Sequence, residues 1–181
     1  MDKLRVRPWA SRMICTTLAA LLVGTFYLGM NAEAAAAPLS KAGVISKQVQ
    51  LAAMYAKIQA DRAAKVVELV NKERTNAGLA SLVVHDKLRG LAKDKAIDLY
   101  KHNYFSHTSP TYGSPFDMMD AYNITFRYAG ENIAKGQRTP EEVVKDWMNS
   151  PGHRANILNP HYKMIGVGYF NGLWVQEFIG K

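Results

Sequence analysis

Apolar residues recur at helical spacing through the middle of the chain. The stretch "SKQVQLAAMYAKIQAD", within residues 38–61, lacks glycine and proline and has only a thin apolar stripe, which predicts an exposed helix. We interpret it as a spacer helix, and the alternative is an interaction helix. The next stretch, "AAKVVELVNKERTNAG", continues the pattern through Val66 and Val70. The two stretches can therefore form one unbroken helix that stops at Gly78.

A second amphipathic segment follows a short polar interval. Its apolar positions from Leu88 to Tyr100 form a broad face, which predicts a helix over 86–102 with Asp86 as the N-cap. Asn103 can end this helix in a left-handed conformation. The following "YFSHTSPTYGSP" has the composition of a loop, and "FDMMDAYN" predicts one more short helix.

The clearest helix start lies in "TPEEVVKDWM". Thr139 as the N-cap, Pro140 at the first helical position and Glu142 three residues after Thr139 predict a capping box with a leading proline. Apolar residues spaced four apart along this segment share one face of the predicted helix.

A new helical turn is predicted directly after that helix, in "NSPGHRANIL". Ser150 is interpreted as its N-cap and Pro151 as its first residue, which puts His153 at the third position. The positive end of a helix disfavours the charged imidazolium. We therefore expect His153 to stay neutral, the form that binds a metal or accepts a proton.

The end of the chain predicts a β-hairpin. "KMIGVGYF" and "LWVQEFI" flank an Asn-Gly dipeptide at 171–172, which is typical of a two-residue type I′ turn. The resulting register puts Gly166 and Gly168 on one bare face, with Glu177 opposite Gly166, so that another element can approach closely. "AGENIA", residues 129–134, predicts a third short strand. Four helices and a small antiparallel sheet make an α+β layered domain.

The front of the chain has a different composition. A basic start is followed by an apolar run from Met13 to Met30 and then by small residues at alternate positions, which is typical of a secretory signal peptide cut after Ala34. The alternative is an uncleaved membrane anchor, because the run is long enough to span a bilayer. We predict three segments: a signal peptide over 1–34, a helical spacer or linker over 35–62, and a folded domain over 63–181.

Cysteine content and charge narrow the classes of function. The single cysteine, Cys15, lies in the predicted signal peptide, so the exported part would have no disulfide, thiol nucleophile or cysteine-ligated metal. The total charge is +8, of which the predicted exported part keeps +6. This charge suits contact with an anionic cell wall or membrane surface, or it serves solubility alone. Nucleic acid is not expected as a partner, because the basic residues are scattered without an aromatic cluster.

Residues 130–170, "GENIAKGQRTPEEVVKDWMNSPGHRANILNPHYKMIGVGYF", strongly resemble the bacterial branch of the CAP superfamily of cysteine-rich secretory, antigen 5 and pathogenesis-related 1 proteins. Upstream, "VNKERTNAGLASLVVHDKLRGLAKDKAIDLYKHNYFSHTSP" resembles the first half of the same domain. The resemblance covers about residues 64–180. It implies an α-β-α sandwich, which fits the α+β elements predicted above, and an SCP-like extracellular protein.

The resemblance also implies a cleft. The family often carries two histidines and two acidic residues that hold a divalent metal in some members. The first histidine matches His107 in "FSHTSP", the first acid matches Glu131 in "GEN", and the second histidine matches His153 in "SPGHR". The second acid of the animal and plant branch falls near Ser150, where this chain has no carboxylate. The tetrad is at best a triad here.

Two imidazoles and one carboxylate are a sensible ligand set for Zn²⁺ or another divalent metal, with a fourth position open to water. Such a water could attack a peptide or an ester. In the alternative, Glu131 accepts hydrogen bonds from backbone amides, and His107 and His153 contact each other through water. Ser150 as a nucleophile is disfavoured, because its hydroxyl is expected to cap a helix and no Gly-x-Ser-x-Gly elbow surrounds it.

Two functions of different classes follow for a protein secreted or held at the cell envelope. The first is a binding module with a His/Glu cleft that takes an unknown ligand, such as a cell-wall or lipid component. The second is a divalent-metal-dependent, peptidase-like hydrolase that uses His107, Glu131 and His153 in the same cleft. The sequence does not decide whether the protein is an enzyme, and it does not fix the oligomeric state.

Overall fold

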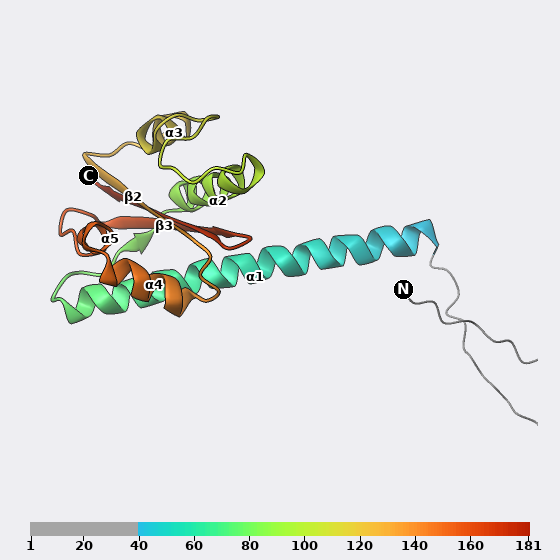
Figure 1. Cartoon of the computed structure of the whole chain (residues 1–181), viewed down its shortest axis with the longest axis horizontal. Helices are drawn as coiled ribbons and strands as arrows, with labels where there is room; N and C mark the ends of the chain where they lie inside the picture. Colours follow the sequence, from blue (N-terminus) through green and yellow to red (C-terminus); the bar gives the residue numbers. More distant parts are fainter. Residues whose placement is uncertain (1–39) are drawn as a thin grey trace, which may run out of the picture. The chain divides into compact units, whose positions relative to one another are not determined.

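The computed structural model describes residues 40–181, which begin with one long helix, α1, Lys41–Asn76 (Figure 1). The Ser40 hydroxyl caps its start, and Gly78 follows its end with a φ of +75°. The two predicted helical stretches therefore form one unbroken helix, as the continuous pattern allowed. The predicted signal peptide lies outside the described residues, and so does the start of the predicted spacer.

The exposed and buried parts of α1 meet near the predicted boundary at 62/63. Ala63 is the first buried residue of the helix, and Val66, Val70 and Arg74 follow it. Arg74 is itself buried and donates hydrogen bonds to the carbonyl oxygens of Ala80, Ile157 and Asn159. The last third of α1 is thus built into the domain. The boundary itself stays a prediction, because the helix passes through it without a break.

A four-stranded sheet forms the middle layer, with the order β1-β3-β4-β2. Its strands are β1, Val83–Val84; β2, Tyr128–Lys135; β3, Met164–Phe170; and β4, Leu173–Gly180. β2, β3 and β4 pair antiparallel, as predicted. The two-residue β1 pairs parallel to β3 and was not predicted, because two consecutive valines carry no periodic signal.

The predicted hairpin turn is confirmed. Asn171 and Gly172 both have positive φ values, 45° and 82°, as a type I′ turn requires. The bare glycine face is also confirmed, since the helix α2, Asp86–Lys101, packs directly on it. A Cβ on Gly166 would lie 2.3 Å from the backbone carbonyl carbon of Leu88, so only glycine admits this close packing.

The N-cap of α2 corrects one prediction. The cap is His85, whose Nδ1 accepts a hydrogen bond from the Leu88 amide at 3.2 Å, while Asp86 is already the first helical residue. The helix ends as predicted, with Asn103 in the left-handed region at a φ of 49°. The short helix α3, Pro115–Ala121, follows, and Ser114 and Asp117 form a capping box at its start.

Two consecutive helices, α4, Pro140–Asn149, and α5, Pro151–Ile157, raise the total within residues 40–181 to five rather than four. Thr139 caps α4 by accepting from the Glu142 amide at 3.1 Å. Glu142 accepts from the amide of Arg138 rather than that of Thr139, so only half of the predicted capping box forms. Ser150 occupies the N-cap position of α5, but its side chain makes no capping hydrogen bond, which corrects the prediction.

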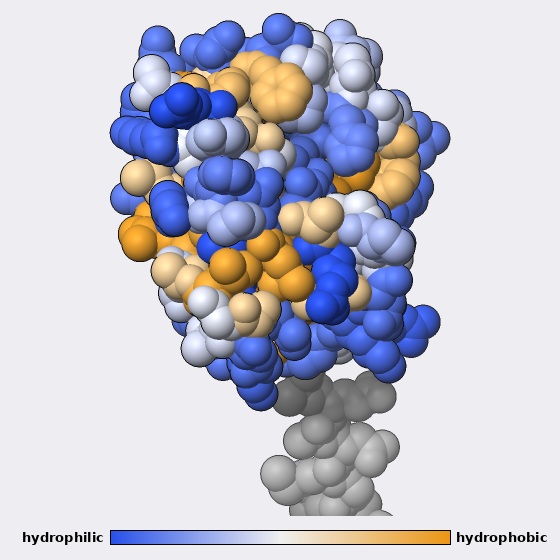
Figure 2. Space-filling view, turned by 90° about the vertical axis from the view of Figure 1, so that its left-hand side faces the viewer, coloured by the Kyte–Doolittle hydropathy of each residue, from blue (hydrophilic) through white to orange (hydrophobic). Residues whose placement is uncertain are grey.

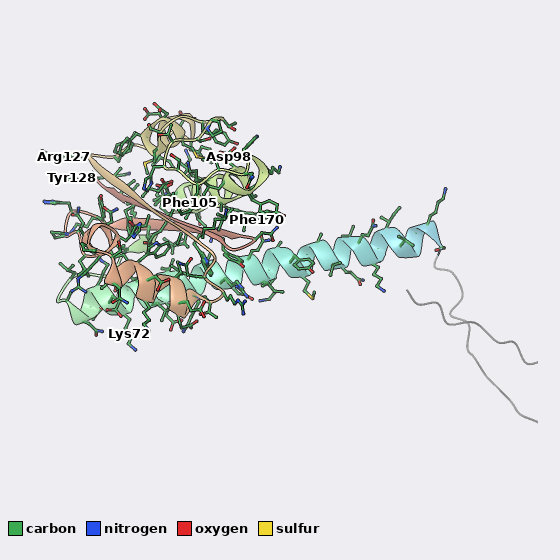
Figure 3. The ribbon with its side chains drawn as sticks, viewed as in Figure 1. Lys72, Asp98, Phe105, Arg127, Tyr128 and Phe170 are labelled. Carbon is green, nitrogen blue, oxygen red and sulfur yellow. The ribbon has the colours of Figure 1, made fainter. Side chains whose placement is uncertain are left out.

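These elements form an α-β-α sandwich. α2 and α3 cover one side of the sheet, whereas α1 and α4 lie on the other (Figure 1). The sheet runs from Tyr128, at the start of β2, to the region of Phe170, at the hairpin end (Figure 3). The end of the domain seen in Figure 2 is mainly hydrophilic, with apolar side chains gathered in patches. Within residues 40–181 no helix is long and apolar enough to cross a membrane.

Candidate functional site

His107 and Glu131 form a direct pair. The Nδ1 atom of His107 lies 2.6 Å from Oε1 of Glu131. The histidine side chain is 55% exposed, whereas the glutamate side chain is 2% exposed. The hydrogen bond from His107 to Glu131 raises the pKa of the imidazole above its ordinary value, although partial burial acts in the opposite direction. The buried carboxylate beneath the exposed imidazole therefore favours its protonated form.

The loop that carries His107 is fixed to α2. Asp98, labelled in Figure 3, accepts hydrogen bonds from the hydroxyls of Ser109 and Thr111 at 2.6 and 2.8 Å, and from that of Tyr104. Lys95, on the preceding turn of α2, is buried and donates to the backbone carbonyl of His107 at 2.7 Å. These contacts fix the position of the loop residue His107 relative to α2.

A second buried carboxylate lies beside Glu131. Glu131 and Glu177 are directly opposite each other on β2 and β4, and Glu177 is fully buried. Phe170 and Leu173 flank a two-residue turn, so the backbone groups of Leu173, and by alternation those of Glu177, point toward β3. Glu177 therefore makes no backbone hydrogen bond to Glu131 on β2, and in such a non-hydrogen-bonded pair the opposing side chains are closest. Neither oxygen of ionised Glu177 has a donor, and Glu131 Oε2 also lacks one.

Burial and this pairing both favour the protonated form of Glu177. Burial, followed by the charge of Glu131, raises its pKa well above the ordinary glutamate value. A protonated Glu177 can donate a hydrogen bond to Oε2 of Glu131, which gives a partner to two of these three oxygens. The floor of the site thus holds the carboxyl groups of Glu131 and Glu177 and the amine of Lys95, whose own pKa is lowered by burial.

His153 lies on α5, which packs against α4 and β2. It lies at the third position of α5, as predicted, and its pKa is lowered by burial first and by the charge of His107 second. The expected neutral state is therefore favoured, but the main cause is burial rather than the helix terminus. The Asn132 side chain donates to the His153 carbonyl at 3.1 Å and the Asn156 side chain donates to the Glu131 carbonyl at 3.1 Å, which ties α5 to β2.

The predicted metal ligands do not present themselves as one ligand set. Nδ1 of His107 and Oε1 of Glu131 form a hydrogen bond with each other. Within the described part of the chain, the His153 side chain makes no direct hydrogen bond to either of them. No group of three or more His, Cys, Asp or Glu side chains among residues 40–181 has the arrangement of a metal site. The residues therefore do not fit a preformed zinc centre, and metal binding stays a prediction.

Three residues of this site were not predicted as such: Glu177, Lys95 and Asp98. The hairpin register did place Glu177 opposite Gly166, on the face that proved to be covered by α2. Lys95 lies seven residues after Leu88, within the buried stripe of α2, and a lysine in that stripe was a signal of a buried charge partner. Asp98, seven residues after Leu91, lies in the same stripe and carried the same signal.

The fold is a CAP-type α-β-α sandwich. The model of the cysteine-rich secretory protein (CAP) family matches residues 67–178, and the chain belongs to this family. It is 59% identical to YkwD of Bacillus subtilis over 119 residues, or 65% of this chain and 46% of YkwD. It is 36% identical to the membrane protein YlbC of the same organism over 127 residues, or 70% of this chain and 37% of YlbC.

Two solved structures extend the comparison. An extracellular SCP-domain protein from Bacillus anthracis superposes with a TM-score of 0.68 and 30% identity, covering 80% of this chain and 45% of that one. An outer surface protein from Borrelia burgdorferi gives a TM-score of 0.59 and 25% identity, covering 64% of this chain and 89% of that one. The two solved structures share the fold of this chain. The chain spans less than half the length of the two Bacillus subtilis relatives.

Proposed function

We propose that this protein acts outside the cell or at the cell envelope as a binding module, and that its cleft takes a ligand bearing a carboxylate or phosphate. The observation that carries this proposal is the exposed His107 imidazole, whose Nδ1 lies 2.6 Å from the buried Glu131 carboxylate, a contact that raises the pKa of the imidazole. A cationic donor with a free Nε2–H at the surface binds an anionic oxygen. Neutral His153 supplies a second polar contact nearby.

Charge and kinship support the proposed location. The part of the chain after the predicted signal peptide carries +6, which attracts an anionic wall polymer or lipid surface. The Bacillus anthracis and Borrelia burgdorferi structures are of an extracellular protein and an outer surface protein. Envelope polymers and lipid headgroups both provide the phosphate and carboxylate groups that the cleft would recognise.

Isothermal titration calorimetry tests the binding proposal directly. The probes are a glycerol phosphate polymer, a peptidoglycan fragment with a free carboxylate, and vesicles of anionic lipid, each titrated into the purified full chain. We expect binding to at least one probe at pH 6, with about a tenfold loss in His107→Ala. His161→Ala, which alters an exposed histidine stacked on Tyr128, is the matched control. Equal affinity in all three proteins would overturn the proposal.

The metal-dependent hydrolase is the competing function, and it needs a different measurement. It requires stoichiometric uptake of Zn²⁺ by the full chain and loss of uptake in His153→Ala. Titration with zinc and metal analysis of protein purified without chelator provide the test. Lack of uptake in the unmodified chain removes the hydrolase and leaves the binding module intact.

A further inference from the structure

The edge of the sheet opposite the candidate cleft is incompletely covered. The cleft lies along β2, which is one edge strand, whereas β1 and β3 form the other side of the sheet. The pairing of β1 with β3 ends at Val84 and Ile165, because the chain turns into α2 at Asp86. The rest of β3, up to Phe170, extends past the end of its partner.

The backbone groups of Val167 and Tyr169 point off this uncovered edge. Phe170 and Leu173 form the hydrogen-bonded pair of the turn, and alternation along the ladder turns Val167 and Tyr169 away from β4. Their N–H and C=O groups make no hydrogen bond to any group within residues 40–181. These four strand-type backbone groups face the groove without a partner, those of Val167 at its floor, where the residue is 2% exposed, and those of Tyr169 nearer the surface.

A groove of about 560 Å³ lies over these groups. One wall is α1, which contributes a series of alanines, including exposed Ala56, Ala60 and Ala64. The other wall is the first half of α2, where Gly90 has nothing within 4 Å of the position of a Cβ. Small side chains on both walls leave room for a polypeptide backbone to reach the edge of β3.

The charges at the rim define the chemistry of the occupant. Two carboxylates at the rim are already paired, Asp61 with Lys57 at 2.7 Å and Asp86 with Arg89 at 3.0 Å. Lys93 also lines the groove and is exposed, and it has no ion pair within residues 40–181. The free charge of the groove is thus positive.

We propose that this groove binds an extended acidic segment of a partner protein, which adds to the sheet as a strand beside β3. The segment pairs its backbone with Val167 and Tyr169, places small side chains against the alanines of α1, and directs a carboxylate to Lys93. Alternating backbone donors and acceptors select a peptide in strand conformation over a lipid. The site is independent of the histidine cleft, because the two lie on opposite edges of the sheet.

Selection from a random dodecapeptide library with the purified full chain provides the ligand for the test. We expect acidic peptides whose affinity falls at least tenfold in Ala60→Trp, which fills the groove, and in Lys93→Glu, which reverses its charge. The matched controls are Ala53→Trp and Lys101→Glu, two exposed positions outside the groove. Both controls should keep the affinity of the unmodified chain. Peptides that bind all five proteins equally would overturn the proposal, as would a library without binders.

Amide hydrogen exchange gives a second measurement that does not depend on any variant folding. Binding of the selected peptide should slow exchange of the Val167 and Tyr169 amides at least tenfold, because both become hydrogen-bonded. Two versions of the peptide can be made, with N-methyl groups on the odd or on the even residues. Only the version that blocks the N–H groups facing β3 should lose binding. Unchanged exchange at Val167 and Tyr169 in the complex would contradict strand addition.

Discussion

Two neighbouring pairs of polar side chains on β2 and β4 differ in how many of their hydrogen bonds are formed. Asn132 faces Gln176, and one residue earlier on β2 Glu131 faces Glu177, so alternation directs the two pairs to opposite faces of the sheet. Asn132 donates to Gln176 Oε1 and to the His153 carbonyl and accepts from Asn156, which leaves only Gln176 Nε2 without a partner. The carboxylate pair, by contrast, leaves three oxygens without donors.

We interpret the amide pair as structural and the carboxylate pair as part of the proposed binding site. A buried amide that makes its hydrogen bonds stabilises a unique packing of α5 against β2. Two buried carboxyl groups without donors cost stability, and such a cost persists where the groups serve a site. In this molecule the costly pair lies beneath the exposed imidazole of His107. The pair of His102 and Asp98 is the contrasting case, because the Asp98 carboxylate makes four hydrogen bonds.

The amide pair should give the largest effect on stability. Asn132→Ala removes three hydrogen bonds and leaves the buried Gln176 side-chain oxygen without its donor, so we expect a loss of about 3 kcal/mol in the free energy of unfolding. Urea unfolding measures it. Asn149→Ala, at an exposed position of α4, should change stability by no more than about 0.5 kcal/mol. Equal losses in both variants would mean that the amide network is not structural.

The carboxylate pair should respond in the opposite direction. Glu177→Gln keeps a donor toward Glu131 and removes the cost of ionisation, so at pH 8 the variant should be more stable than the unmodified chain by about 1–3 kcal/mol. Because the folded pKa of Glu177 is raised, its stabilising contribution is complete below the ordinary glutamate value and is lost as pH rises through the folded pKa. The difference should therefore shrink toward pH 4.

Urea unfolding between pH 4 and pH 9 checks this dependence, with Glu141→Gln at an exposed position of α4 as the control. A control curve parallel to that of the unmodified chain, together with a flatter curve for Glu177→Gln, supports the interpretation. If Glu177→Gln lowers stability at pH 8, the pair is stabilising and the comparison with the amides fails.

Local signals in the sequence were sufficient for most of the fold. The Asn-Gly turn set the register of β3 and β4, and the unbroken helical pattern predicted α1 through to the residues before Gly78. Both features depend on residues close together in the chain. His85 was missed as a cap because histidine is not among the usual N-cap residues, and β1 was missed because it exists only through its pairing with β3.

The site was predictable only where the family resemblance marked it. His107 and Glu131 were named from that resemblance and do form a pair. Glu177 lies far from Glu131 in the sequence, and only the pairing of β2 with β4 shows that they face each other. Register between strands that are distant in sequence depends on the whole packing, so no local pattern could reveal the second carboxylate.

The exposed half of the carboxylate site should give a smaller effect. Glu131→Gln removes the charged hydrogen-bond acceptor that raises the pKa of His107, so the imidazole should titrate at a lower pH in the variant. The stability from this pair is complete below the ordinary histidine pKa and is lost as pH rises through the folded pKa. Because His107 is more than half exposed, that contribution is at most about 1 kcal/mol.

Nuclear magnetic resonance titration of the His107 ring measures the change. Glu142→Gln, which alters the capping glutamate of α4, should leave the His107 titration where it is in the unmodified chain. If His107 titrates equally high without Glu131, the pair at 2.6 Å does not hold its charge, and the buried carboxylates lose their proposed connection to the exposed imidazole.

The smallest effect is expected at Ser150, near which the resemblance puts the second acid of the animal and plant branch and where this chain has a hydroxyl. That hydroxyl caps neither helix, so Ser150→Ala should change the free energy of unfolding by no more than about 0.5 kcal/mol. Thr139→Ala, which removes a true cap, should cost about 1 kcal/mol. Thermal unfolding of both variants makes the comparison. If Ser150→Ala costs as much as Thr139→Ala, its hydroxyl has a structural partner, and the polar groups around the carboxylate pair extend into the loop between α4 and α5.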